Sequence, residues 1–310
     1  MTKYVIKRLL TIIPTLVLVT LIVFTILELS PGDPGRIILG QAAPQSAVDQ
    51  LNEELGTNDP YFVRYSNYIG GIILHGDFGN SYQSGRPVLE ELSHCFPITL
   101  RLAVFSIMLI SLVGITFGII SAVKQYSALD YISSVTAILL SAIPVFWFGL
   151  MMIIVFSLKL RWLPSGKLDD WTGYILPIVT MSLPYSGLVL RMTRSSMLES
   201  INQDYIRTAR AKGAPERKVV LGHALKNALL PVVTVLGTTF GYSLGGAVLT
   251  ESVFSLNGVG TLLVTAIKMK DMPLVMGSII ILSAMFCLVI LAVDILYGFI
   301  DPRVKAIYKK

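Results

Sequence analysis

The sequence predicts an all-α membrane protein with six transmembrane helices. Of its 310 residues, 54% are hydrophobic and 14% are charged, whereas a typical soluble domain has about 25% charged residues. The mean hydropathy is +0.71. Six apolar runs are each long enough to cross the hydrocarbon core, which takes about 20 helical residues. They are residues 9–29, 98–123, 131–158, 174–192, 228–250 and 274–300.

A basic start precedes the first apolar run and contains Lys3, Lys7 and Arg8. The run is longer than the ~7–15-residue core of a secretory signal, and no small-residue cleavage site follows it. We therefore predict a retained helix, so that residues 1–29 form a cytoplasmic tip and the first span.

Residues 30–97 are predicted to form a small folded unit outside the cytoplasm. The segment begins with the turn sequence PGDP at residues 31–34, which ends the first helix. Further along, Tyr61, Tyr65 and Tyr68 recur at helical spacing. This periodicity indicates folded structure rather than a flexible linker.

The distribution of basic residues predicts that both termini lie in the cytoplasm. In a six-span topology, most of the 25 Lys and Arg residues lie on the same side of the membrane as the N-terminus. Cytoplasmic loops are enriched in Lys and Arg. Residues 98–300 then form the membrane core, with a cytoplasmic loop at residues 193–227, and residues 301–310 form a cytoplasmic tail. Topology explains the net charge of +6 better than nucleic-acid binding does.

Small residues and prolines inside the spans predict close packing and broken helices. Glycines at four-residue spacing let two helix backbones approach closely, and a broken helix often lines a cavity or a moving joint. The sequence leaves two roles open, namely packing within the bundle and lining a substrate path. The positions are Gly114, Gly118, Pro144, Pro184, Gly237, Gly241 and Gly245.

Asp294 is the deepest ionisable residue of the last span. Such a residue is expected to have a function or a partner, because an unpaired charge in the membrane is costly. It lies under two helical turns from the end of that span, so we expect a structural ion pair with Arg191 or Arg194.

The sequence carries no motif for catalysis or for phosphate binding. It has no G-x-x-x-x-G-K-[ST] loop, no H-E-x-x-H and no G-x-S-x-G. Its three histidines are isolated and its two cysteines form no C-x-x-C pair. We therefore predict no catalytic residue, no metal and no cofactor bound by this chain, so energy for uphill transport must come from a partner or an ion gradient.

The longest polar run between apolar segments in the second half of the chain is residues 200–231, read SINQDYIRTARAKGAPERKVVLGHALKNALLP. Gly213 is typical of a helix C-terminus, and Pro215 is typical of a helix start. The segment is thus predicted to form two short helices with a tight corner between them. Taken alone, it also fits an ordinary basic loop of a multispan protein.

This segment resembles the coupling loop of importer-type ABC transporter permeases of the dipeptide, oligopeptide and nickel family. The resemblance rests on DYIRTARAKG at 204–213 and HALKNALLP at 223–231, and extends over nearly the whole chain through YVIKRLL at 4–10, PGDP at 31–34, RMTRSSM at 191–197 and DPR at 301–303. The general family pattern has Glu-Ala-Ala before the glycine, so only Ala209 and Gly213 match it literally. SLNGVG at 255–260 also departs from the usual Trp-Pro-Gly-Leu-Gly.

The resemblance implies the type I ABC importer permease fold in the inner (cytoplasmic) membrane of a prokaryote. It also implies a second homologous permease, two cytoplasmic ATPases that bind ATP and Mg, and an extracytoplasmic binding protein that delivers short peptides. Nickel, metal–opine complexes and glutathione are alternative substrates, and an ATPase-independent channel or carrier is an alternative of another class. The residues implied at the ATPase contact are Asp204, Tyr205, Arg207, Ala209, Arg210, Gly213, Ala214 and Glu216.

Overall fold

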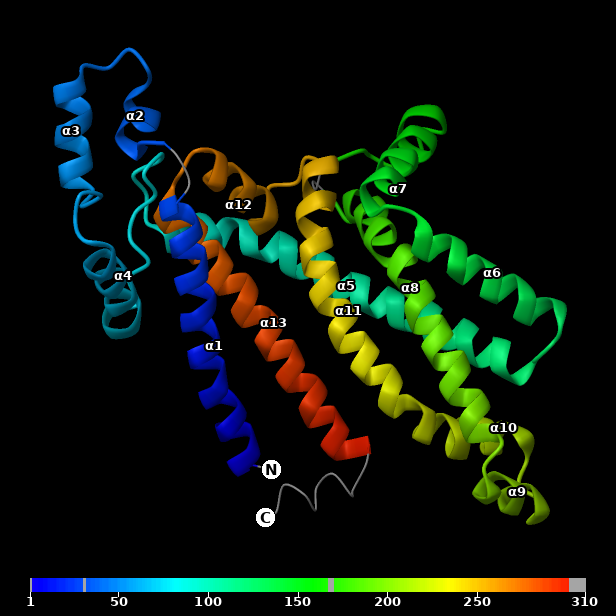
Figure 1. Cartoon of the computed structure of the whole chain (residues 1–310). Coiled ribbons are helices and arrows are strands. Elements are labelled where there is room, and N and C mark those ends of the chain that lie inside the picture. The colour runs from blue at the N-terminus through cyan, green and yellow to red at the C-terminus, as the bar shows by residue number, and fades with distance from the viewer. Residues whose placement is uncertain (1, 30–31, 167–169, 301–310) are drawn as a thin grey trace. The chain divides into compact units, whose positions relative to one another are not determined.

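The computed structural model describes residues 2–29, 32–166 and 170–300 (Figure 1). The predicted cytoplasmic tail, residues 301–310, lies outside the described residues. The chain forms two compact units, and helices α1 (Thr2–Leu29), α5 (Val88–Val123) and α13 (Met272–Ile300) contribute to both. Among the described residues, the larger unit comprises residues 2–9, Leu100–Leu256 and residues 286–300, and the smaller unit comprises Leu10–Thr99 and Asn257–Met285.

The predicted all-α membrane fold is confirmed. Within the described ranges, five helices are long and apolar enough to cross a membrane, and a bent pair raises the number to six if it counts as one span. The five are α1, α5, α8 (Thr172–Ile201), α13 and the continuous run of α10 (Glu216–Lys218), η2 (Val219–Ala224) and α11 (Leu225–Val253). The bent pair joins α6 (Ala128–Ala142) to α7 (Val145–Met152) and η1 (Ile153–Lys159).

Proline breaks one of these spans and leaves another intact. The two halves of the bent pair meet at 101°, where Pro144 precedes α7 and the residue before it, Ile143, is extended, as a following proline favours. Pro184, in contrast, lies inside a continuous α8, so the expectation of a broken fourth span is wrong. Pro184 is buried, and the packing around it outweighs the loss of one backbone hydrogen bond.

Helix α8 lies at the centre of the larger unit, where it packs against α6, α7 and α11 (Figure 1). On α5, Gly114 and Gly118 face it. A Cβ atom built on Gly114 would stand 2.7 Å from Cβ of Val189, and one on Gly118 would stand 2.5 Å from Cβ of Thr193. The two backbones therefore approach more closely than any larger residue would allow.

The smaller unit joins its short helices through polar contacts and a small apolar core. Asp33 caps α2 (Pro34–Leu39) by accepting a hydrogen bond from Arg36 N, and it also accepts one of 2.7 Å from Asn52 on α3 (Gln45–Glu54). Ser81 donates to the buried carboxylate of Asp271. The remaining helices of this unit are α3 (Gln45–Glu54), α4 (Tyr61–His75) and α12 (Val259–Lys268). The core contains Val88, Leu92, Val259, Ala266, Leu274 and Val275.

Candidate functional site

The predicted corner in segment 200–231 is present. Helix α9 (Asp204–Ala211) ends where Gly213 takes a left-handed backbone with φ of 75°, a conformation that glycine adopts without strain. Gly213 N donates to Arg210 O over 2.9 Å, and Ala214 N donates to Ala209 O over 3.2 Å. Pro215 then leads into α10. The local sequence alone is therefore enough to reverse the chain here.

An apolar anchor fixes this segment to the ends of three membrane helices. The side chain of Ile206 is fully buried, which contributes roughly 1.5–3 kcal/mol relative to leaving it in water. Ile206 was not among the predicted residues, although it is the large aliphatic side chain of α9. Its cluster draws on α5, α8, η2 and α11, and contains Ala122, Met197, Ile206, Val219, Val220, Ala224 and Ala228.

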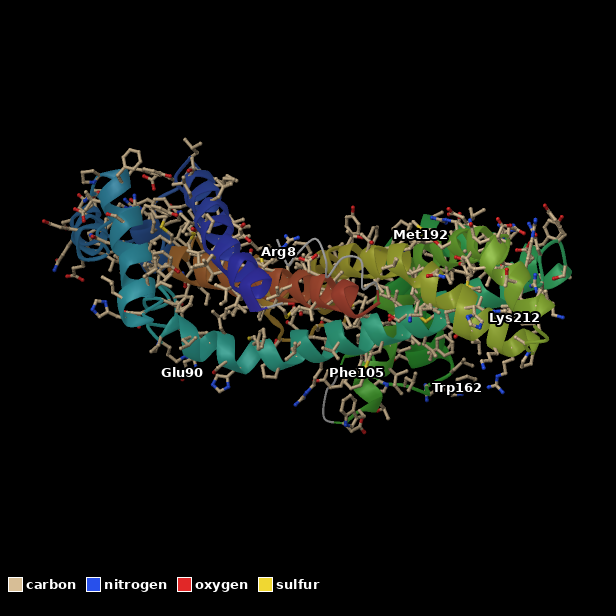
Figure 2. All side chains as sticks on the ribbon, turned by 90° about the horizontal axis from the view of Figure 1, so that it is seen from below. Arg8, Glu90, Phe105, Trp162, Met192 and Lys212 are labelled. Carbon is tan, nitrogen blue, oxygen red and sulfur yellow. The ribbon has the colours of Figure 1, made fainter. Side chains whose placement is uncertain are left out.

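The residues implied by the family resemblance divide between this anchor and an exposed surface. Ala209 and Ala214 pack against the cluster. We call the remaining residues the α9 face, because they are exposed around α9 and its corner. Figure 2 shows the neighbouring Lys212 at the same end of the larger unit. The α9 face consists of Asp204, Tyr205, Arg207, Arg210, Gly213 and Glu216.

Charge pairs hold the α9 face in shape. Arg210 donates two hydrogen bonds to Glu216, of 3.1 Å from Nε and 2.6 Å from Nη2, which joins α9 to α10 across the corner. These bonds raise the pKa of Arg210. A looser pair joins Arg207 to Asp204 at 3.7 Å. The result is an exposed polar surface that carries charges of both signs.

A second arginine–carboxylate pair lies inside the larger unit. Arg194 on α8 donates to both oxygens of Asp130 on α6, over 2.7 and 2.9 Å, and Ser121 on α5 donates to the same carboxylate. Asp130 is 3% exposed. Sequence reasoning missed this pair, although Ser127 and Asp130 have the spacing of a helix start. Three helices thus meet at one buried carboxylate.

The partner expected for Asp294 is wrong. Its Oδ2 lies 3.1 Å from Arg8 Nη2, so the ion pair joins the first residues of α1 to α13. Arg194 is engaged by Asp130, and Arg191 donates instead to Ser141 Oγ and to Ala137 O. The two predicted arginines are turned toward α6, which no local pattern in the sequence indicates.

The three glycines of α11 do not form one uniform contact. A Cβ atom on Gly237 would stand 3.0 Å from Val293, and one on Gly241 would stand 2.6 Å from Phe286, both on α13. Around Gly245, nothing lies within 4 Å of such an atom. The row of glycines therefore packs against α13 at Gly237 and Gly241 and has open space at Gly245.

Gly245 belongs to a polar stripe that the described part of the chain leaves exposed. Exposed residues of α11 recur every three or four positions, which places them on one helix face, and most of them are small or polar. Exposed residues of α6, such as Ile132, Val135 and Ile138, are apolar instead. We call this face the α11 stripe; it consists of Pro231, Thr234, Thr238, Tyr242, Gly245, Leu249 and Ser252.

Comparisons with known proteins agree along the whole chain. The family model described as "Binding-protein-dependent transport system inner membrane component" matches residues 114–306, and the corresponding N-terminal model matches residues 1–103. The glutathione transport system permease protein GsiC of Escherichia coli (strain K12) is 40% identical over 305 residues, which cover 98% of this chain and 99% of that protein. GsiC of Salmonella choleraesuis (strain SC-B67) has the same identity and coverage.

A solved structure described as an amino acid ABC transporter with histidines covers 69% of this chain and 94% of its own, with 13% identity and a TM-score of 0.48. The family model spans well over half of the chain, and the curated relatives span nearly all of it. The chain therefore belongs to the binding-protein-dependent transport permeases and is a multi-pass inner-membrane permease subunit of a bacterial ABC importer.

Proposed function

We propose that this permease forms, with a second homologous permease, the translocation path for short peptides, and that glutathione is the first substrate to test. The support is the 40% identity, over 98% of the chain, to permeases named for glutathione transport. Glutathione is itself a tripeptide, so the two substrate descriptions agree in size and in polarity. A binding protein on the outer side delivers the substrate, and both termini lie in the cytoplasm.

The energy for transport comes from ATP hydrolysis by two separate ATPases, one of which binds the α9 face. The observation that carries this proposal is a charged, exposed surface attached to an apolar anchor. ATP and Mg bind to those ATPases and not to this chain. Because Ile206 packs with residues of α5, α8 and α11, a displacement of α9 moves the ends of three spanning helices as one body.

The α11 stripe lines the path. A polar face of a spanning helix is unfavourable against lipid and is found where it meets protein or water. A close helix–helix contact requires small residues along its length, whereas Tyr242 is 63% exposed in the middle of the stripe. Tyr185 donates to the carbonyl oxygen of Tyr242 over 3.2 Å, which supports the backbone at that point. The α11 stripe runs from segment 200–231 toward the C-terminal end of α11. The same helix therefore connects the ATPase contact to the path.

The test is a reconstituted importer that contains this chain, its partner permease, both ATPases and the binding protein. We expect ATP-dependent uptake of labelled glutathione. Gly213→Trp should leave the complex assembled and hydrolysing ATP but abolish uptake, because the new side chain is large and stands on the α9 face. Gln125→Trp, in the exposed turn after α5, is the matched control and should transport normally.

Each outcome separates one alternative. Normal uptake by Gly213→Trp contradicts the docking of the ATPase at the α9 face. Uptake of dipeptides or nickel without uptake of glutathione changes the substrate and leaves the mechanism intact. Transport by this chain in liposomes without any ATPase identifies a channel or carrier.

A further inference from the structure

Helix α4 reaches the part of α1 that lies inside the membrane. The hydroxyl of Tyr65 donates to Val17 O over 2.9 Å and lies 3.0 Å from Thr20 Oγ1. The hydroxyl of Tyr61 lies 2.7 Å from Thr25 Oγ1. Val17 precedes Leu29, the last residue of α1, by about 18 Å along the helix axis at 1.5 Å per residue. Figure 1 accordingly shows α4 beside α1 and not beyond its end.

The side of α4 that faces away from the membrane centre is marked by Arg64. Its guanidinium donates to both oxygens of Glu28, over 2.8 and 3.0 Å, and Glu28 is next to the end of α1. The same group lies 5.6 Å from the ring centroid of Phe24, which is itself buried. Arg64 therefore points toward the aqueous end of α1, and Tyr65 points toward the deeper part.

The opposite side of α4 is apolar and uncovered. At 100° per residue, Phe62 and Ile73 lie about 160–180° around the helix from Arg64. Phe62 is 77% exposed and Ile73 is 66% exposed. Ile69 is half-buried and lies on the same side, about 140° from Arg64. Asn67 and His75 fall nearer to Arg64, whereas the exposed Leu74 and Val63 lie about 80–100° from it. The exposed surface of α4 is therefore polar around Arg64 and mainly apolar away from it, with Ser66 as the polar exception.

We propose that α4 is an interfacial helix, with Phe62, Ile69 and Ile73 inserted among the lipid acyl chains of the leaflet at the Leu29 end of α1. Lipid is the fitting occupant because this apolar edge points along α1 into the span, where water-soluble partners do not reach. An amphipathic helix lies in this way in the plane of a membrane, with its apolar edge buried at the acyl boundary. The predicted extracytoplasmic unit thus rests partly in the bilayer, and the two tyrosine contacts set its depth.

The experiment places one nitroxide label at a time on the assembled importer in liposomes. Cys95→Ser and Cys287→Ser first remove both native cysteines. Phe62→Cys and Ile73→Cys are the test positions, and Asn67→Cys, on the same helix, is the matched control. Electron paramagnetic resonance then compares collisions with oxygen, which concentrates in lipid, and with a water-soluble nickel chelate.

We expect a higher ratio of oxygen to chelate collisions at residues 62 and 73 than at residue 67. An equal ratio at the three positions overturns the proposal. A second measurement uses the same variants before labelling. A membrane-impermeant maleimide should react with Asn67→Cys and react much more slowly with Phe62→Cys. Equal reaction rates overturn the proposal independently, and neither result depends on the substrate or on the ATPase contact.

Discussion

Two regions of the larger unit each contain an arginine–carboxylate pair and a glycine, but these residues have different roles in the two regions. The seam between α5, α6 and α8 contains the Arg194–Asp130 pair and Gly114, and the α9 face contains the Arg210–Glu216 pair and Gly213. Both pairs are bidentate. In the seam, the carboxylate is buried and its loss leaves a charge without a partner. On the α9 face, water solvates both groups, so the pair shapes a surface and contributes little to folding.

The glycines differ in the same way. Gly114 is needed because another backbone lies close to it, whereas Gly213 has nothing within 4 Å of an added Cβ atom and is needed for its φ of 75°. One glycine serves tertiary packing, and the other serves local backbone geometry. Residue type alone therefore does not reveal the role of a glycine; its packing and its backbone conformation do.

The largest effect is expected from Asp130→Ala. Removing the carboxylate leaves Arg194 without its partner in a partly buried position, which should cost about 3–5 kcal/mol. The measurement is thermal unfolding of the purified chain in detergent. Asp204→Ala removes a carboxylate that is 96% exposed and should leave the midpoint unchanged. Equal unfolding midpoints for the two variants would show that the ion pair does not stabilise the seam between α5, α6 and α8.

Gly114→Ala should come next. The added methyl group would stand 2.7 Å from Cβ of Val189, and overpacking of this kind costs about 1–3 kcal/mol. The matched control is Gly245→Ala on α11, where space is open and alanine improves helix propensity by up to about 1 kcal/mol. Unfolding midpoints should therefore move in opposite directions. A fall of equal size in both would contradict the difference in packing between Gly114 and Gly245.

Gly213→Ala should have a smaller effect on stability. Alanine in a left-handed conformation costs about 1 kcal/mol. Gly222→Ala, in the helical part of the same segment, is the control, because nothing closer than 3.7 Å meets the new methyl group and its unfolding midpoint should not fall. Limited proteolysis of the loop at residues 203–216 should detect the loosened corner. Equal protection in both variants would show that the corner does not require glycine.

Glu216→Gln should have the smallest effect on folding, because this side chain is more than half exposed. We expect no measurable change in the unfolding midpoint, together with a lower ratio of uptake to ATP hydrolysis in the reconstituted importer. Glu199→Gln, an exposed acid on α8, is the matched control and should retain the normal ratio. A stability loss comparable to that of Asp130→Ala would remove the distinction between the two regions.

Local sequence was sufficient for the features that depend on neighbours along the chain. Runs of apolar residues gave the spanning helices because the cost of burying polar groups in lipid is set residue by residue. Gly213 and Pro215 gave the corner because each restricts or permits its own backbone angles. Pro144 and Pro184 mark the limit of such reasoning, since the same residue type bends one span and is accommodated within another.

By itself, the sequence determined the membrane class, the spans, the helix–corner–helix of segment 200–231 and, through its motifs, the permease family. Only the tertiary structure decided the partners of Asp294 and Arg194, the packed and open ends of the α11 glycines, the Ile206 anchor and the contact of α4 with α1. The physical reason is distance along the chain. Arg8 meets Asp294, Asp130 meets Arg194 and Tyr65 meets Val17, and no periodicity or local propensity encodes contacts of that range.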